Sequence, residues 1–417
     1  MSCSTIQISD ECNTAAFGID GLRFEPNLVL HGDVSDGVRE TKILSNTGGV
    51  VGHFVTHAPD FEYRDYGVHV GQVDRLTFVS AAPQVITGVF IDCRKRSATL
   101  GHKVRLSFTA SPSRKLVIPP GVAHTFENIQ NVVTRNDLSV YCDAFNTAWN
   151  VEDDNLTLAL DIAGEDVPAL DTNVHPLPFA AAVMFYRMQQ HLLRGGRNVT
   201  EHVIEADIGG ARRAVVASHE KHSAPVRMPA VPGGSRVPGF GFEHNAYLAT
   251  VANSFAVLPG TDSCVMDFVV LEAAPPTGEA PFALHTRHDV MHTFLDRTGE
   301  ELVVDIVDLR RDSGARGERT SVTFECDPRA HVRIPAGVAY RYRGGGAFAA
   351  RVEYALFLDE NEPRPDLPPI DADRIMIRRG DLLWRDGVVT PKVPAPPEAL
   401  WFLARRETET VDRMEHE

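Results

Sequence analysis

The sequence predicts an all-β protein built from two tandem copies of one domain. Residues 66–126 align with residues 282–342 without a gap, at an offset of 216 residues. Both copies consist of short apolar runs, rich in β-branched residues, separated by polar turns. This pattern is typical of β-sandwiches and barrels. The repeat is a duplicated domain, because solenoid units have periods of only about 20 to 50 residues.

The two copies share identical residues at matching positions. Asp92, Arg94, Ser97, Gly101, Phe108, Pro112 and Ile118 align with Asp308, Arg310, Ser313, Gly317, Phe324, Pro328 and Ile334. Pro119, Gly121, Val122 and Ala123 align with Pro335, Gly337, Val338 and Ala339, and His69 aligns with His285.

Each element of the repeat follows from its residue pattern. The segments 88–94 and 302–310 are apolar runs that end in polar turns, as expected of buried strands. The segments 103–111 and 319–327 alternate polar and apolar residues, which predicts half-buried strands. The segments 115–126 and 331–342 contain a proline and glycine that predict a tight turn between two strands.

The chain outside the repeat has a different character. Residues 178–196 contain no internal turn residue and end in arginine and glycine, which predicts a helix. Residues 223–242 are rich in proline and glycine and predict a linker or arm. We therefore expect an N-terminal domain, a helix-containing linker, a C-terminal domain and a charged tail. Their expected bounds are 1–175, 176–240, 241–395 and 396–417.

Composition narrows the class of protein. The 417 residues carry a formal net charge of −15, with 23% charged residues. Nucleic-acid and anionic-membrane partners are not expected, because both need a basic surface. The six cysteines form no CxxC pair, and the N-terminus shows no basic segment followed by an apolar one. These features favour a cytoplasmic protein with reduced thiols.

The turn of the first copy carries a recognisable motif. Residues 119–128, PPGVAHTFEN, resemble the second signature of the cupin superfamily, which implies a jelly-roll, or double-stranded β-helix, in each copy. Metal-binding cupins need a His-x-His pair, because alternate residues of a strand face one side and can hold one ion. The sequence contains no His-x-His. His285 and His288, three residues apart, would face opposite sides of one strand, and Tyr340 replaces the histidine of the turn. We expect no metal and no other cofactor; a metal-dependent oxygenase or decarboxylase is the alternative.

A narrower resemblance covers residues 62–171 and, in weaker form, 278–357. Asp92-x-Arg94, followed by Ser97, Thr99 and Gly101, and then Ile118–Phe126, resemble the dTDP-4-dehydrorhamnose 3,5-epimerases, which are metal-independent cupins. A strand tyrosine and a Trp-Asn pair follow as Tyr141 and Trp149-Asn150.

The resemblance implies roles for particular residues. His69 corresponds to the family's catalytic base, Tyr141 to its acid and Asp171 to the carboxylate that orients the base. His124 corresponds to a substrate contact. The second copy offers His285, Tyr354 and Tyr340 as the equivalents. A histidine and a tyrosine suit removal and return of a proton next to a ketone.

The chain also departs from the family. Tyr66 and Phe282 replace the arginine that meets the diphosphate. The lysine that usually follows the base is also missing, and Arg75, close in sequence, is its candidate substitute. We take Tyr66 and Arg75 as candidate substrate-binding residues. An anionic diphosphate needs cations, so the loss of the family's arginine argues against a substrate that carries a nucleotide diphosphate.

These observations predict a metal-independent acid–base isomerase acting α to a ketone, most economically on a nucleotide-linked 4-keto-6-deoxysugar in a biosynthetic pathway. One alternative uses the same groups on a non-nucleotide small molecule, as a cyclase or dehydratase of natural-product biosynthesis. A second is a catalytically inactive bicupin that binds a ligand or partner. Family members exchange N-terminal strands as dimers, so the resemblance implies an intrachain pseudo-dimer that can itself form a homodimer.

Overall fold

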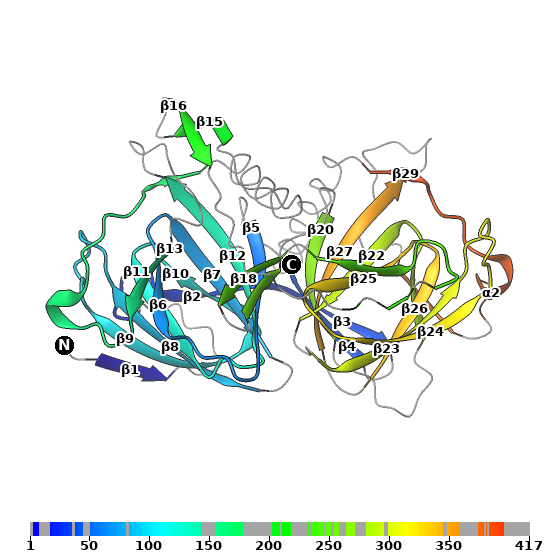
Figure 1. Cartoon of the computed structure of the whole chain (residues 1–417), viewed down its shortest axis with the longest axis horizontal. Helices are drawn as coiled ribbons and strands as arrows, with labels where there is room; N and C mark the ends of the chain where they lie inside the picture. Colours follow the sequence, from blue (N-terminus) through cyan, green and yellow to red (C-terminus); the bar gives the residue numbers. More distant parts are fainter. Residues whose placement is uncertain are drawn as a thin grey trace, which may run out of the picture. The chain divides into compact units, whose positions relative to one another are not determined.

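The chain forms two compact units of β-sheet in a computed structural model (Figure 1). One unit consists of residues 1–27, 45–226 and 247–258, and the other of residues 28–44, 227–246 and 259–417. The structure describes residues 3–7, 17–35, 38–44, 51–80, 83–142, 155–177, 202–208, 211–217, 230, 232–233, 235–245, 247–251, 254–257, 264–271, 281–295, 299–344, 348–358, 374–378, 381 and 383–395. The expected helix at 178–196, the Trp149-Asn150 pair and the charged tail lie outside the described residues.

The first unit contains two large sheets. The first sheet has the order β1 (Cys3–Gln7), β9 (Lys103–Thr109), β8 (Val85–Asp92), β11 (Val122–Glu127), β6 (Asp65–His69) and β13 (Asn155–Ala159). The second has the order β18 (Tyr247–Val251), β19 (Ser254–Val257), β5 (Val51–His57), β12 (Val133–Cys142), β7 (Gln72–Val79), β10 (Ser111–Ile118) and β2 (Arg23–Pro26), with β14 (His175–Pro176) beside β12. A separate hairpin pairs β15 (His202–Ile208) with β16 (Ala211–Ala217), and one 3-10 turn covers Gly164–Asp166.

The second unit repeats this plan. Its first sheet has the order β24 (Arg319–Glu325), β23 (Glu301–Asp308), β26 (Val338–Arg343), β21 (Phe282–His285) and β28 (Arg374–Ile377). Its second has the order β17 (Gly241–His244), β25 (Ala330–Ile334), β22 (His288–Phe294), β27 (Phe348–Leu358), β20 (Cys264–Leu271), β4 (Val38–Leu44) and β3 (Leu28–Ser35), with β29 (Val393–Pro394) beside β27. The short helix α2 covers Leu383–Asp386. The chain thus forms two tandem cupin-type jelly-rolls, as the sequence predicted.

Each half of the chain contributes a hairpin to the unit formed mainly by the other half. The hairpin β18–β19, from the second half of the chain, extends the first unit's sheet by pairing β19 with β5. The hairpin β3–β4, from the first half, extends the second unit's sheet by pairing β4 with β20. The units are therefore interleaved in the sequence, unlike the contiguous domains expected at 1–175 and 241–395. The pseudo-dimer and the homodimer stay predictions.

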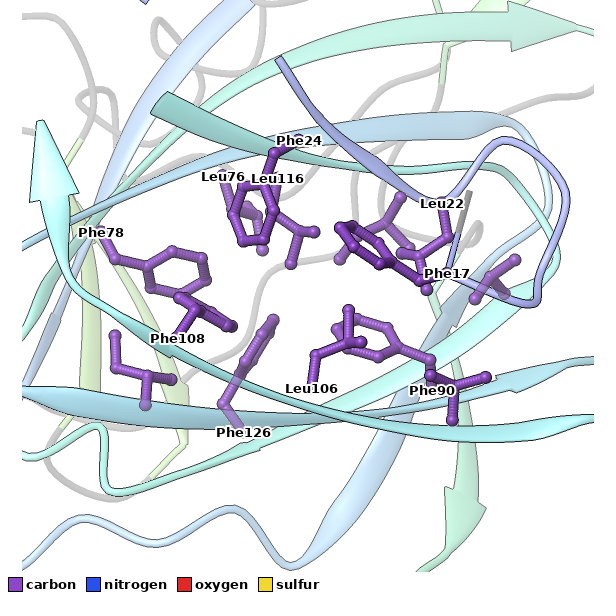
Figure 2. Close-up of a cluster of buried hydrophobic side chains, with 14 of the residues drawn as sticks. Phe17, Leu22, Phe24, Leu76, Phe78, Phe90, Leu106, Phe108, Leu116 and Phe126 are labelled. Carbon is purple, nitrogen blue, oxygen red and sulfur yellow. The ribbon is translucent and has the colours of Figure 1, made fainter. Parts of the chain in front are cut away.

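Aromatic and aliphatic side chains from both sheets fill the first unit (Figure 2). Phe78 of β7 and Phe108 of β9 have ring centroids 5.2 Å apart, and Phe78 and Phe126 of β11 are 5.1 Å apart. The alternation that predicted β9 is visible in its burial, since every second residue is buried and its neighbours are not. Burial of about a dozen such side chains is the main stabilising contribution to this unit.

The motif that dominates the repeat has a structural role in both copies. Asp92 is fully buried and accepts hydrogen bonds from Arg94 Nε at 2.8 Å and from the Ser97 and Thr99 hydroxyls, each at 2.6 Å. Asp308 is held in the same way by Arg310 and Ser313. A buried carboxylate is tolerated only when its oxygens are bonded, so these residues fix the turn after β8 and β23.

No helix among the described residues is long and apolar enough to cross a membrane.

Candidate active site in the first unit

Three strands direct polar side chains into the first barrel. Leu76 and Phe78 of β7 point into the interior (Figure 2). Alternate residues of a strand share a face, so Asp74 faces the same interior. His124 follows Phe126 into the interior from β11, and the two rings are 5.9 Å apart. On β6, Tyr66 and Val68 belong to a separate buried cluster on the other side of the sheet. His69 therefore faces the interior.

The three interior polar residues form one cluster. Asp74 Oδ2 lies 3.7 Å from His69 Nε2 and 3.4 Å from His124 Nε2. The two imidazole rings are 6.0 Å apart. The Asp74 side chain is 3% exposed, whereas those of His69 and His124 are 19% and 13% exposed. The carboxylate is thus buried beneath two imidazoles that solvent can reach.

Two neutral side chains hold the carboxylate in place. Gln72 Nε2 and Asn136 Nδ2 donate hydrogen bonds to Asp74 Oδ1 at 2.5 and 2.8 Å. Burial opposes ionisation of Asp74, but His69, His124 and these two hydrogen bonds together lower the pKa of its carboxyl below the usual value. Oδ1 is fixed by the amides, and Oδ2 faces the imidazoles.

The histidines differ in their surroundings. His124 Nδ1 lies 3.2 Å from the Val122 carbonyl oxygen. Because a carbonyl only accepts, Nδ1 carries the hydrogen and Nε2 faces Asp74. Burial lowers the pKa of His69, an effect that Asp74 opposes and His124 reinforces. The cluster therefore combines a neutral imidazole, a carboxylate and a second imidazole with a defined tautomer.

A tyrosine and a third histidine lie beside the cluster. Tyr63 donates its hydroxyl hydrogen to His57 Nε2 at 3.0 Å, while His57 Nδ1 donates to the Val132 carbonyl at 2.8 Å. Burial lowers the pKa of His57 to about 4, partly opposed by that backbone hydrogen bond. Burial, reinforced by the charge of Asp74, raises the pKa of Tyr63. Both side chains are uncharged near neutral pH.

Four of the residues that the sequence singled out lie elsewhere. Tyr66 packs with Val68 on the other side of the sheet. Arg75 faces away from Asp74 along β7 and donates to Ser139 Oγ at 2.5 Å. Tyr141 follows Ser139 on that outer face of β12, by the same alternation. Asp171 is 64% exposed and pairs with Lys95 at 3.0 Å. The structure therefore brings together His69 and His124, with Asp74 as the neighbouring carboxylate.

The second barrel has a different interior cluster. His285 stacks against Tyr340, with ring centroids 6.3 Å apart, and lies 6.0 Å from Tyr354. At the offset of the repeat, Tyr354 is the counterpart of Leu138, and the counterpart of Tyr141 is Phe357. Tyr354 and Tyr141 are therefore not equivalent, which corrects the pairing made from the sequence.

His288 also corrects an expectation. His285 ends β21 and His288 begins β22, so the two residues lie on different strands. Their rings approach to 5.9 Å. The prediction that they face opposite sides of one strand was wrong, because a turn at 286–287 separates the strands.

Asp74 is the residue that the sequence analysis missed. A signal was present, since Gln72, Asp74, Leu76 and Phe78 alternate along one face of β7 and become polar toward one end. A carboxylate on the apolar face of a buried strand needs a partner. The sequence alone did not identify that partner, because the contacts come from β6 and β11.

The two jelly-rolls define a cupin-type fold. Comparison with known families shows which family of cupins the first unit resembles. Residues 65–175 match the model of the dTDP-4-dehydrorhamnose 3,5-epimerase family. The match confirms the resemblance predicted from the sequence motifs. It spans the strands that carry His69, Asp74 and His124. No curated protein matches the chain.

Several solved structures are similar to parts of the chain. The dTDP sugar isomerase of Desulfovibrio desulfuricans is 17% identical over 36% of this chain and 90% of its own, with a TM-score of 0.26. NovW, a 4-keto-6-deoxy sugar epimerase of Streptomyces spheroides, is 12% identical over 45% and 96%, with a TM-score of 0.27. The 7S globulin of Momordica charantia is 9% identical over 82% and 88%, with a TM-score of 0.24.

Proposed function

We propose that the first barrel is an acid–base isomerase that inverts a carbon next to a ketone, with a nucleotide-linked 4-keto-6-deoxysugar as substrate. The observation that carries the proposal is the contact of His69 and His124 with one buried carboxylate, Asp74. This cluster lies within the segment that matches the epimerase family. Both imidazoles are partly exposed, so a ligand in solution can reach them.

Each residue has a defined task in the proposed reaction. His69 removes the proton from the carbon next to the ketone, and the electron pair moves onto the carbonyl oxygen as an enolate. A pKa lowered by burial keeps His69 neutral and able to accept that proton. His124 returns a proton to the other face of the carbon. Asp74 is the positioning residue, because it stabilises the imidazolium that forms.

His124, rather than Tyr141, is the acid in this reaction. His124 faces the same interior as His69, whereas Tyr141 follows Ser139 on the outer face of β12. Solvent restores the protonation of both imidazoles after each turnover, since both are partly exposed.

A second candidate substrate is a non-nucleotide ketone processed by the same groups. The orientation of Arg75 favours it, because this arginine donates to Ser139 and faces away from the cluster. A diphosphate is usually held by such cations. Calorimetry with dTDP alone separates the two substrates. Binding of dTDP supports the nucleotide sugar, and the absence of dTDP binding supports the non-nucleotide ketone.

Solvent exchange tests the proposed chemistry. The protein is incubated in D2O with a dTDP-4-keto-6-deoxyhexose, and the mass of the sugar is followed. Deuterium uptake is expected with the native chain and with His285→Ala, the matched control in the second barrel. His69→Ala should lose it. Uptake that survives His69→Ala would refute the assignment, and no uptake by the native chain would favour a different ketone or a non-catalytic binding protein.

A further inference from the structure

We propose that His69, Asp74 and His124 also bind one divalent transition-metal ion, which competes with the proton chemistry of the same residues. The inference goes beyond the proposed function and does not rest on it. It depends only on the positions and chemistry of three donor atoms.

The donor atoms have the spacing of a metal site. His69, Asp74 and His124 each offer one donor atom, and these three atoms all lie within 4.8 Å of one another. Zinc bonds nitrogen and oxygen at about 2.0–2.2 Å in tetrahedral geometry, which places neighbouring ligand atoms about 3.3 Å apart. The Asp74 oxygen lies 3.4 and 3.7 Å from the two nitrogens. Small side-chain rotations would complete the geometry.

The tautomer of His124 supports a cation between these atoms. Its Nδ1 hydrogen is donated to the Val122 carbonyl, so a neutral ring presents only a lone pair at Nε2. That lone pair lies 3.4 Å from a carboxylate oxygen. Two lone pairs at this distance repel unless a proton or a metal ion lies between them. Metal-binding imidazoles commonly donate their other N–H to a backbone carbonyl in this way.

The orientation of the Asp74 carboxylate also favours binding of a metal ion. Gln72 and Asn136 both bond Oδ1, which leaves Oδ2 as the oxygen that faces the imidazoles. Asp74 is 2% exposed, and a buried negative charge is stabilised by a cation. The partly exposed imidazoles leave open positions for water or a small ligand on the ion.

The donor set selects the class of ion. Two imidazoles and one carboxylate suit Zn²⁺, Fe²⁺ or Co²⁺, whereas Mg²⁺ and Ca²⁺ prefer all-oxygen sites. The repeat supplies an internal comparison, because Val290 and Tyr340 of the second barrel are the counterparts of Asp74 and His124. Neither counterpart is a carboxylate or an imidazole, so among the described residues we expect this ion in the first barrel alone.

The test titrates the chelator-treated, tag-free chain with ZnCl₂ by calorimetry and with Co²⁺ by visible absorption. One ion per chain is expected, together with the d–d bands of low-symmetry Co²⁺. Asp74→Asn and His124→Gln should weaken binding about 100-fold or more, and His285→Ala should not. Asparagine at position 74 can still accept from Gln72 and Asn136, so the fold should survive; circular dichroism and thermal melting check this.

The outcomes separate this inference from the proposed function. Both proposals are supported if Asp74→Asn abolishes Zn²⁺ binding and if the metal-free chain catalyses deuterium exchange that Zn²⁺ suppresses. Zn²⁺ binding without exchange supports the metal site and removes the isomerase. Absent Zn²⁺ binding, or binding that Asp74→Asn leaves unchanged, overturns the metal site whatever the exchange result.

Discussion

Asp74 on β7 and His124 on β11 lie 50 residues apart in sequence and belong to different sheets, yet Asp74 Oδ2 is 3.4 Å from His124 Nε2. The contact crosses the interior of the barrel. It occurs because Asp74 continues the apolar face of β7 and His124 continues that of β11. The aromatic core and the polar cluster therefore lie next to each other in the interior of the first barrel.

The identity of the proton donor can be tested by comparing two substitutions. His124→Gln should retain deuterium uptake, because His69 still removes and returns a proton on one face. It should lower the rate of inversion by about 10²–10⁴, the usual effect of losing a general acid. Tyr141→Phe should change both rates little. Separate measurement of uptake by mass and of inversion by NMR checks this. If Tyr141→Phe alone abolishes inversion, the acid has been assigned to the wrong residue.

The stability of the first unit should depend on pH through His57. The pKa of His57 is about 4 in the folded chain, whereas the ordinary value for histidine, which applies to the unfolded chain, is 6.5. Between these pH values the unfolded state binds a proton that the folded state does not, so stability is fully present above pH 6.5 and falls as the pH drops toward 4. The expected loss is up to about 3 kcal/mol.

Urea unfolding at several pH values, with the native chain and His57→Gln, measures this contribution. Glutamine does not titrate, so the variant should show a shallower dependence on pH in this range. Identical slopes for the two proteins would mean that His57 is not the responsible group.

Gly121 should tolerate no side chain. Its φ is +77°, and an added Cβ would lie 2.6 Å from Arg94 Cγ and from Thr172 Cγ2. Arg94 cannot easily move away, because it is bonded to the buried Asp92. Gly121→Ala should therefore lower the free energy of unfolding by about 2–4 kcal/mol, the combined effect of backbone strain and overpacking.

Gly164 provides the matched control. Its φ is +64°, but nothing lies within 4 Å of an added Cβ. Gly164→Ala should cost about 1 kcal/mol from backbone strain alone. Denaturant unfolding of both variants measures the difference, and equal losses would show that the contact with Arg94 and Thr172 adds nothing.

Much of the fold was predictable from local patterns. The alternation in residues 103–109 predicted β9, and the proline and glycine at 119–121 predicted the turn between β10 and β11. These features are local, because side-chain alternation and turn conformation depend on neighbouring residues. The repeat then extended the same assignments to the second unit.

The candidate site was predicted only in part. His69 and His124 were identified from motifs and do come together, but the expected carboxylate, Asp171, pairs with Lys95 at the surface. Tyr66 was chosen because it stands where the family has an arginine, and Arg75 because it lies close in sequence to the base. Each faces the other side of its sheet, because a shift of one residue along a strand reverses the face.

The sequence by itself determined that the chain contains two related β repeats and which segments of each repeat contain strands. It did so because periodicity and turn residues act over a few positions. Only the tertiary structure decided that Asp74 meets His69 and His124, and that each half of the chain adds a hairpin to a sheet formed mainly by the other half. Both depend on which distant strands become neighbours, and that follows from packing of the whole interior.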